Sequence, residues 1–184
     1  MTFTATSNQT PNCGKKELTV TIHVEKAALT VTTDDKTKVY GVADPTLTAT
    51  VSGMTNGDTE EAVKALLSLQ ISRAQANTSA GENVGEYLIT AQGPETLANY
   101  TVTYQNTGKL TITRATVLVN ADAKTKTYGA ADPTLTATVT GLQYGEQASV
   151  ITYTLSRTAG ENVGEYVITP VGAAVQGNYK VTYA

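Results

Sequence analysis

The sequence predicts a mainly β protein with one short helix in each of two tandem repeats. Three observations predict it: the composition, the alternation of apolar and polar residues, and a repeat within the chain. Thr, Val and Tyr favour strands because branched and aromatic side chains fit a pleated, half-buried surface. The 184 residues include 35 Thr and ten Tyr, against one Phe and no Trp. Hydrophobic residues make up 40% of the chain, which is enough for folded cores.

The repeat is visible in long matching segments. KTKVYGVADPTLTATVSG at 36–53 returns 88 residues later as KTKTYGAADPTLTATVTG at 124–141. Two later segments return only 79 residues later: AGENVGEY at 80–87 and 159–166, and NYTVTY at 99–104, as NYKVTY at 178–183. The second copy is therefore shorter in its middle, which indicates surface loops, where length changes cost little.

These matches divide the chain into three parts. Residues 27–114 are the first repeat domain, and residues 115–184 are the second, with its final strand missing. Residues 1–26 are expected to be the C-terminal strands of a preceding repeat or domain. No linker rich in Gly, Ser or Pro separates the copies, which favours a stiff rod over freely tumbling domains.

Alternating segments predict the strands of the first repeat, and Asp34–Asp44 is expected to be a polar connection. The predicted strands are Leu29–Thr33, Leu47–Val51, Tyr87–Thr90, Tyr100–Tyr104 and Leu110–Thr113, with a further strand near Leu69–Ser72.

One helix is predicted over Thr59–Leu69, because Val63, Leu66 and Leu67 recur at spacings of three and four. Asp58 or Thr59 can cap its start. The second repeat has room only for a shorter helix, near residues 146–150. A helix inserted after a first hairpin and followed by strands is the order of a β-grasp fold. The alternative is an immunoglobulin-like β-sandwich, which needs no helix.

Charge and hydropathy exclude two classes of partner. The net charge is −3 and the basic residues are scattered, whereas a nucleic-acid-binding protein carries a basic face. No apolar run approaches the roughly 20 residues that cross a bilayer, so this segment is not expected to insert into a membrane. The single cysteine, Cys13, cannot form an internal disulfide, which favours a bacterial source for an extracellular protein. The first residues do not resemble a signal peptide, so we expect any export signal to lie outside this segment.

The sequence shows no catalytic constellation, and we expect no enzyme activity and no cofactor. The only histidine, His23, lies in a strand-like pattern. Glu82 and Glu86 lie on a loop and a strand start without the cleft aromatics of a glycosidase. The aspartates at 34, 35, 44 and 58 lack the spacing of a calcium loop and are typical of turns, so no metal site is expected.

Two Tyr-Gly pairs are the candidate site positions. Tyr40 and Tyr128 are either loop anchors, each followed by a glycine with unusual backbone freedom, or platforms for a ligand. Lys–Asn isopeptide bonds are a further hypothesis; the residues concerned are Lys36 or Lys38 with Asn83 or Asn99, and Lys124 or Lys126 with Asn162 or Asn178.

The paired blocks YG-x-ADPTLT and GENVGEY, followed by NYTVTY and GKLTITRA, resemble the MBG repeat of the YGX type. The resemblance covers nearly all of residues 27–184. It implies tandem repetition, a place on the bacterial cell surface and a role without catalysis. The resemblance does not imply a particular ligand or a set of binding residues.

We therefore expect an extracellular stalk or spacer segment of an adhesin-like bacterial surface protein, in contact with neighbouring repeats. The alternative is an adhesive module that binds host glycans or matrix proteins. Because the second repeat lacks its last strand, the strand at Leu18–Val24 of another molecule is expected to fill the open edge. Such strand-swapped association would be a property of this fragment.

Overall fold

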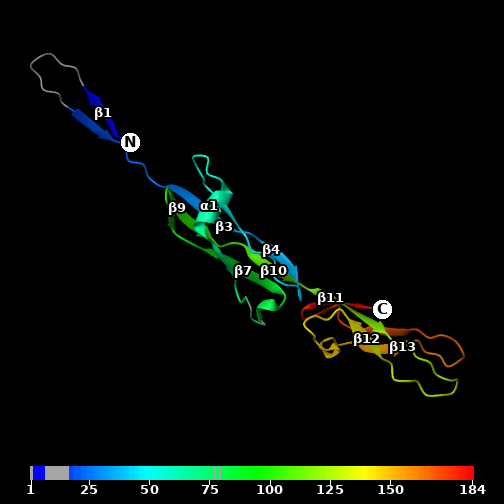
Figure 1. Cartoon of the computed structure of the whole chain (residues 1–184). Coiled ribbons are helices and arrows are strands. Elements are labelled where there is room, and N and C mark those ends of the chain that lie inside the picture. Colours follow the sequence, from blue (N-terminus) through cyan, green and yellow to red (C-terminus); the bar gives the residue numbers. More distant parts are fainter. Residues whose placement is uncertain (1, 7–16, 77, 79) are drawn as a thin grey trace, which may run out of the picture.

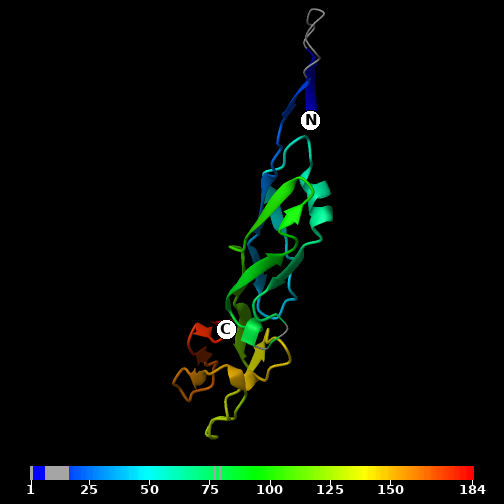
Figure 2. The same ribbon diagram turned by 90° about the vertical axis from the view of Figure 1, so that its left-hand side faces the viewer.

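The computed structural model describes the whole chain except residues 1, 7–16, 77 and 79. We call residues 27–114 repeat 1 and residues 115–184 repeat 2. A hairpin of β1 (Thr2–Thr6) and β2 (Glu17–Thr21) lies at one end, and the two repeats follow it in a row (Figures 1 and 2). The molecule is accordingly elongated rather than round.

Repeat 1 holds two four-stranded sheets. One has the order β5 (Ala49–Ser52), β3 (Ala27–Thr33), β9 (Tyr100–Gln105) and β8 (Thr96–Leu97). The other has the order β4 (Lys36–Val39), β10 (Lys109–Thr113), β7 (Gly85–Gln92) and β6 (Gln70–Arg73). β3 runs parallel to β9, and β4 runs parallel to β10, so that each sheet is mixed.

Helix α1 (Glu60–Leu67) covers the first of these sheets. The hydroxyl oxygen of Thr59 accepts a hydrogen bond from the N–H of Ala62 at 3.3 Å, which caps the first turn. Val63 and Leu67 are buried in a core with strands β3, β5 and β9. The predicted helix and its cap are thus confirmed.

Repeat 2 follows the same plan with fewer paired residues. Its four-stranded sheet has the order β12 (Ala137–Thr140), β11 (Ala115–Ala121), β16 (Tyr179–Tyr183) and β15 (Val175–Gln176). A separate pair consists of β13 (Thr154–Arg157) and β14 (Ile168–Val171). One-turn 3-10 helices lie at η1 (Ala80–Glu82) in repeat 1 and at η2 (Ala148–Val150) in repeat 2.

The mainly β fold class and the position of the helix in repeat 1 are confirmed. Two details differ from the sequence prediction. The expected polar connection at Asp34–Asp44 contains β4, which pairs with β10. The sequence did not predict this strand because Lys36 and Lys38 are polar and do not give the apolar alternation typical of a strand. The short helix expected in repeat 2 is only the 3-10 turn η2, since the shortened chain leaves no room for a longer one.

Two hydrophobic cores result. One lies inside repeat 1, beneath α1. The other runs across both repeats, from Tyr40, Leu110 and Ile112 to Val117 and Tyr179. Among the described residues, no helix combines the length and the apolar character needed to span a membrane. The second core therefore joins the two repeats.

Candidate functional site

Repeat 1 passes into repeat 2 without a linker, at a contact that we call the joint. β10 ends at Thr113 and β11 begins at Ala115, so that Arg114 alone lies between them. Within repeat 2, the N–H of Ala115 donates to the carbonyl of Asn178 at 3.1 Å, so the first residue of the repeat is fixed beside β16. Arg114 Nε donates to the carbonyl of Gly177 at 3.3 Å. The last residue of repeat 1 is therefore bonded directly to repeat 2.

Tyr40 lies at the centre of the joint, although it belongs to repeat 1. Its side chain is only 5% exposed. Its ring meets Tyr144 and Tyr179 edge to face, with centroids 5.2 and 5.5 Å apart. Its hydroxyl donates to Glu146 Oε1 at 2.9 Å. Edge-to-face pairs are favourable because the positive ring edge meets the negative ring face. Tyr40 is thus inserted into repeat 2.

The carboxylate of Glu146 binds two tyrosine hydroxyls at once. It accepts from Tyr179 as well as from Tyr40, and Tyr179 in turn accepts from the N–H of Gln143 at 2.9 Å. Burial, together with the hydrogen bond to Glu146, raises the pKa of Tyr179 to about 12. The same two causes raise the pKa of Tyr40. Both hydroxyls therefore remain protonated donors at neutral pH.

A second loop of repeat 1, from the GENVGEY block, holds the other side of the joint. The side chain of Asn178 donates to Asn83 Oδ1 and accepts from the N–H of Val84, both at 2.9 Å. The hydroxyl of Tyr144 donates to Glu82 Oε2 at 3.1 Å. Both repeated sequence blocks of repeat 1 therefore contact repeat 2.

Four charged side chains fasten these two loops of repeat 1 together, and we call them the quartet. Lys38 Nζ lies 2.7 Å from Asp44 Oδ1, and it also contacts Glu82. Arg73 Nε lies 2.6 Å from Asp44 Oδ2, while its Nη2 contacts Glu82. Arg73 Nη1 donates to the carbonyl of Gly81 at 2.8 Å. The Lys38 and Arg73 side chains are 3% and 1% exposed, so the two cations are buried and fully paired.

The pKa shifts of all four quartet groups favour their ionised forms at neutral pH. The hydrogen bond from Arg73 lowers the pKa of Asp44, against the opposing effect of burial. Burial alone would raise the pKa of Glu82, but hydrogen bonds from Lys38, Tyr144 and Arg73 lower it overall. Burial alone would lower the pKa of Lys38, but the hydrogen bonds to Asp44 and Glu82 outweigh this effect and raise the pKa overall.

Repeat 2 carries the same quartet in a more exposed form. Lys126 pairs with Asp132 and Glu161 at 2.7 and 2.6 Å, and Arg157 pairs with the same two carboxylates at 2.7 and 2.6 Å. The side chains of Lys126 and Arg157 are 22% and 18% exposed. Hydrogen bonds from Arg157 and Lys126 lower the pKa of Asp132 to about 2.

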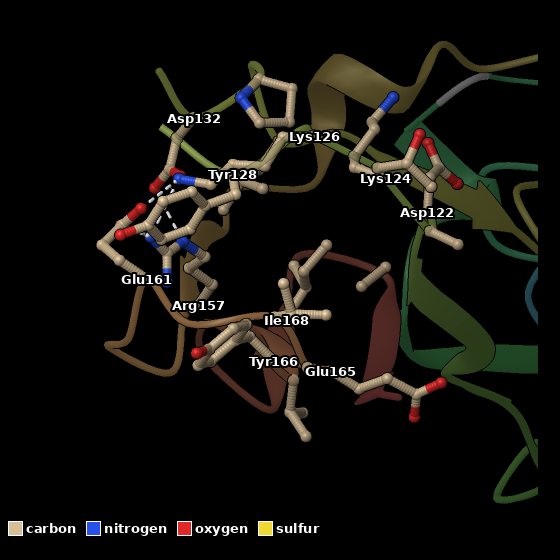
Figure 3. Close-up of a pocket in the computed structure, with 18 of the residues that line it drawn as sticks. Asp122, Lys124, Lys126, Tyr128, Asp132, Arg157, Glu161, Glu165, Tyr166 and Ile168 are labelled. Atoms are coloured by element: carbon tan, nitrogen blue, oxygen red, sulfur yellow. Dashed lines mark hydrogen bonds and ion pairs between the residues drawn. The ribbon is translucent and has the colours of Figure 1, made fainter. Parts of the chain in front are cut away.

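Beside this second quartet lies a cavity of about 630 Å³ (Figure 3). Figure 3 shows the quartet residues and Tyr128 at one side of it, Asp122 and Lys124 at the other, and Ile168 and Tyr166 between. Tyr128 is 72% exposed. The two candidate tyrosines thus occupy opposite environments: Tyr40 is buried in the joint, and Tyr128 is open to solvent at the far end of repeat 2.

A family model described as MBG domain (YGX type) matches residues 29–111 and 117–184. The chain belongs to the MBG domain family. The two matches are tandem and cover most of the chain, and they indicate a repeat module of the kind found in surface proteins. Searches among curated proteins and among solved structures gave no match.

Several of the residues considered for a metal or an isopeptide bond bind other groups in the two MBG repeats. Asp34 accepts hydrogen bonds from the hydroxyls of Thr48 and Thr50, and Asp35 accepts one from the N–H of Lys109. The two carboxylates therefore bind different partners. Among the described residues no group of acidic, His or Cys side chains is arranged to hold a metal. Lys38 contacts carboxylates of the quartet instead of an asparagine amide.

Sequence reasoning missed the partners of Tyr40 in the second MBG repeat, namely Tyr144, Glu146, Asn178 and Tyr179. One signal could have found them. Lys, Asp, Arg and Glu of the quartet recur in both copies, and Asn-Tyr follows in both, which indicates that each repeat presents the same two ends.

Proposed function

We propose that this chain is a spacer within the stalk of an adhesin-like protein of the bacterial surface. Each MBG repeat extends the stalk, and the joint keeps successive repeats in line. The chain carries a distal part of the protein away from the cell and performs no chemistry of its own.

The joint supports this proposal more than any other feature. Domains of one chain move relative to each other unless a substantial apolar interface holds them. Here a buried tyrosine, a shared core and several hydrogen bonds join the repeats, and only Arg114 lies between the strands of the two repeats. Such a joint resists bending, which is what a spacer requires.

Small-angle scattering of the full chain at low concentration tests the proposal, with Tyr40→Ala as the variant and Tyr128→Ala as its matched control. Loss of a buried aromatic ring costs about 3–5 kcal/mol. We expect an elongated particle for the wild type, and for Tyr40→Ala a broadened distance distribution that reports bending at the joint. Tyr128→Ala should resemble the wild type, because Tyr128 lies outside the joint. A compact wild-type particle, or a Tyr40→Ala variant as straight as the control, would contradict the spacer role.

A second candidate is an adhesive module for host glycans or matrix proteins, supported by the exposed ring of Tyr128 at the edge of a cavity. Aromatic rings that face solvent suit the apolar faces of sugars. An array of glycans and matrix proteins tests it: a saturable signal that Tyr128→Ala removes and Tyr166→Phe retains would support binding. Silence on the array would favour the spacer.

A further inference from the structure

A groove of about 560 Å³ lies at the joint, and both repeats line it. Repeat 1 contributes Val84, just before β7, and Ile112, near the end of β10. Repeat 2 contributes Ala174 and Val175, where β15 begins, and Lys180 of β16. The volume is within the range of pockets that hold small ligands. The joint therefore creates a groove that neither repeat has by itself.

Each wall of the groove places polar and apolar groups side by side. Val175 pairs with Lys180 across β15 and β16, so their side chains lie on the same face of the sheet. Thr111 pairs with Glu86 in the same way across β10 and β7. Val84 is half-buried, and Val175 is 53% exposed. A ligand with an apolar face and polar edges matches these walls.

Two exposed cations of the groove, Arg114 and Lys180, are unpaired. Arg114 is the one arginine without a carboxylate partner among the described residues, since Arg73 and Arg157 each bind two. Its Nε donates to the carbonyl of Gly177, which leaves the two terminal nitrogens for a ligand. Lys180 likewise forms no ion pair within the part of the chain that the structure describes. Positive charge is thus available here, although the net charge of the chain is −3.

One acidic side chain, Glu86, also lines the groove. Its carboxylate is already paired, because Lys109 Nζ lies 2.7 Å from Glu86 Oε2. The charges of Glu86 and Lys109 balance each other. The charges of Arg114 and Lys180 therefore remain, and they favour an anionic ligand.

We infer that the groove binds an acidic saccharide, carboxylated or sulfated. The acidic groups pair with Arg114 and Lys180, and the apolar face of a sugar ring packs against Val84 and Val175. The planar fork of an arginine matches the two oxygens of such groups, and apolar walls with a few placed polar groups are typical of ligand pockets. This site goes beyond the spacer role, and it lies at the joint instead of beside Tyr128.

The pairing of the strands favours a saccharide over an acidic peptide. An extended peptide gains affinity from main-chain hydrogen bonds to a free strand edge. Around the groove, β7 already pairs with β6 and β10, β10 pairs with β4 and β7, and β16 pairs with β11 and β15. Only the two-residue strand β15 lies at a sheet edge. The groove therefore offers mainly side chains, which suit a saccharide.

The corresponding strands of repeat 1 show that the fold does not require this lysine. Thr101 pairs with β3 and with Thr96, as Lys180 pairs with β11 and with Val175. Threonine therefore occupies both positions in repeat 1. Lys180 and Val175 are thus particular to the groove, and Lys180→Thr is a substitution that the same strand position already tolerates.

A nuclear magnetic resonance titration of the full chain tests the inference. The probes are a galacturonic acid trisaccharide, a sulfated galactose trisaccharide and a neutral galactose trisaccharide. We expect at least one acidic probe to give saturable shifts of the backbone signals of both Thr111 and Val175, and the neutral probe to give none. The acidic probe that binds identifies the acidic group. Shifts confined to one repeat, or equal binding of the neutral probe, would overturn the inference.

The variant Arg114→Gln/Lys180→Thr removes both cations of the groove, and its spectrum without ligand checks that it is folded. A lost hydrogen bond to a charged group weakens binding by about tenfold, so the Kd should rise at least about tenfold. Lys26→Gln/Lys124→Gln is the matched control, because it removes the same charge from two exposed lysines outside the groove. The control should bind like the wild type, and an equal loss in both variants would overturn the site.

A glutamate trimer distinguishes a saccharide from an acidic peptide. We expect it to bind more weakly than the acidic saccharides, because it lacks the apolar face of a sugar ring. If the glutamate trimer bound as tightly as they do, the saccharide assignment would be wrong. If no acidic saccharide binds, the inference fails, while the spacer proposal stands because its scattering test requires no ligand.

Discussion

At the scale of single residues, identical dipeptides have different roles because their surroundings differ. Tyr40-Gly41 lies in the joint, whereas Tyr128-Gly129 faces solvent. Both glycines have positive φ, +89° and +81°, a conformation that other residues adopt only with strain. A methyl group on Gly41 would also collide with the side chain of Gln143 across the joint, while one on Gly129 would meet nothing within 4 Å.

This pair of glycines gives a matched test of the joint. Gly129→Ala should lower the free energy of unfolding by about 1–2 kcal/mol, the cost of a left-handed residue with a side chain. Gly41→Ala should lower it by a further ~1–3 kcal/mol, because Gln143 must be displaced from a packed contact. Denaturant unfolding of the two variants measures the difference. Equal losses of unfolding free energy in the two variants would show that the packing of Gly41 against repeat 2 adds no cost.

At the scale of elements, a strand exists only where its partner exists. KTKVY and KTKTY differ at one residue, yet only the first forms a strand, β4, because only repeat 1 contains β10. The quartet depends on the same elements, since Lys38 lies on β4 and Arg73 on β6. In repeat 1 its cations are buried, and in repeat 2 they are partly exposed. The complete sheet therefore shields the quartet from water.

The quartet predicts a particular loss of stability in acid. The folded pKa values of Asp44 and Glu82 lie below their ordinary values of 3.8 and 4.5. A lowered folded pKa contributes stability that is complete above the unfolded value and is lost as the pH falls through the folded value. The free energy of unfolding should thus fall below about pH 4.5, and Asp44→Asn should reduce this pH dependence.

At neutral pH, Asp44→Asn should also cost about 1–3 kcal/mol, because Arg73 and Lys38 remain buried with one carboxylate fewer. Asp132→Asn is the matched control: its quartet is exposed and screened by water, so the loss should be smaller. Denaturant unfolding as a function of pH measures both effects. The same pH dependence in wild type and Asp44→Asn would contradict this account of the quartet.

At the scale of the whole molecule, the joint turns two small domains into one continuous body. The core that runs from Leu110 to Tyr179 crosses the boundary between the repeats, and the rows of elements in Figures 1 and 2 follow one long axis. An interface of this kind adds reach with each repeat, which is the basis of the scattering test of the spacer.

The sequence by itself determined the repeats, the mainly β composition, most strands and the capped helix of repeat 1, because alternation, helical spacing and self-similarity are local signals. It also singled out Tyr40 and Tyr128 without separating them. Only the tertiary structure decided that Tyr40 is buried in repeat 2, that Lys38 is a strand residue with a buried charge, and that Tyr128 lies exposed at the edge of a cavity. These properties depend on contacts between residues far apart in the chain, such as Tyr40 and Glu146, and no local pattern carries them.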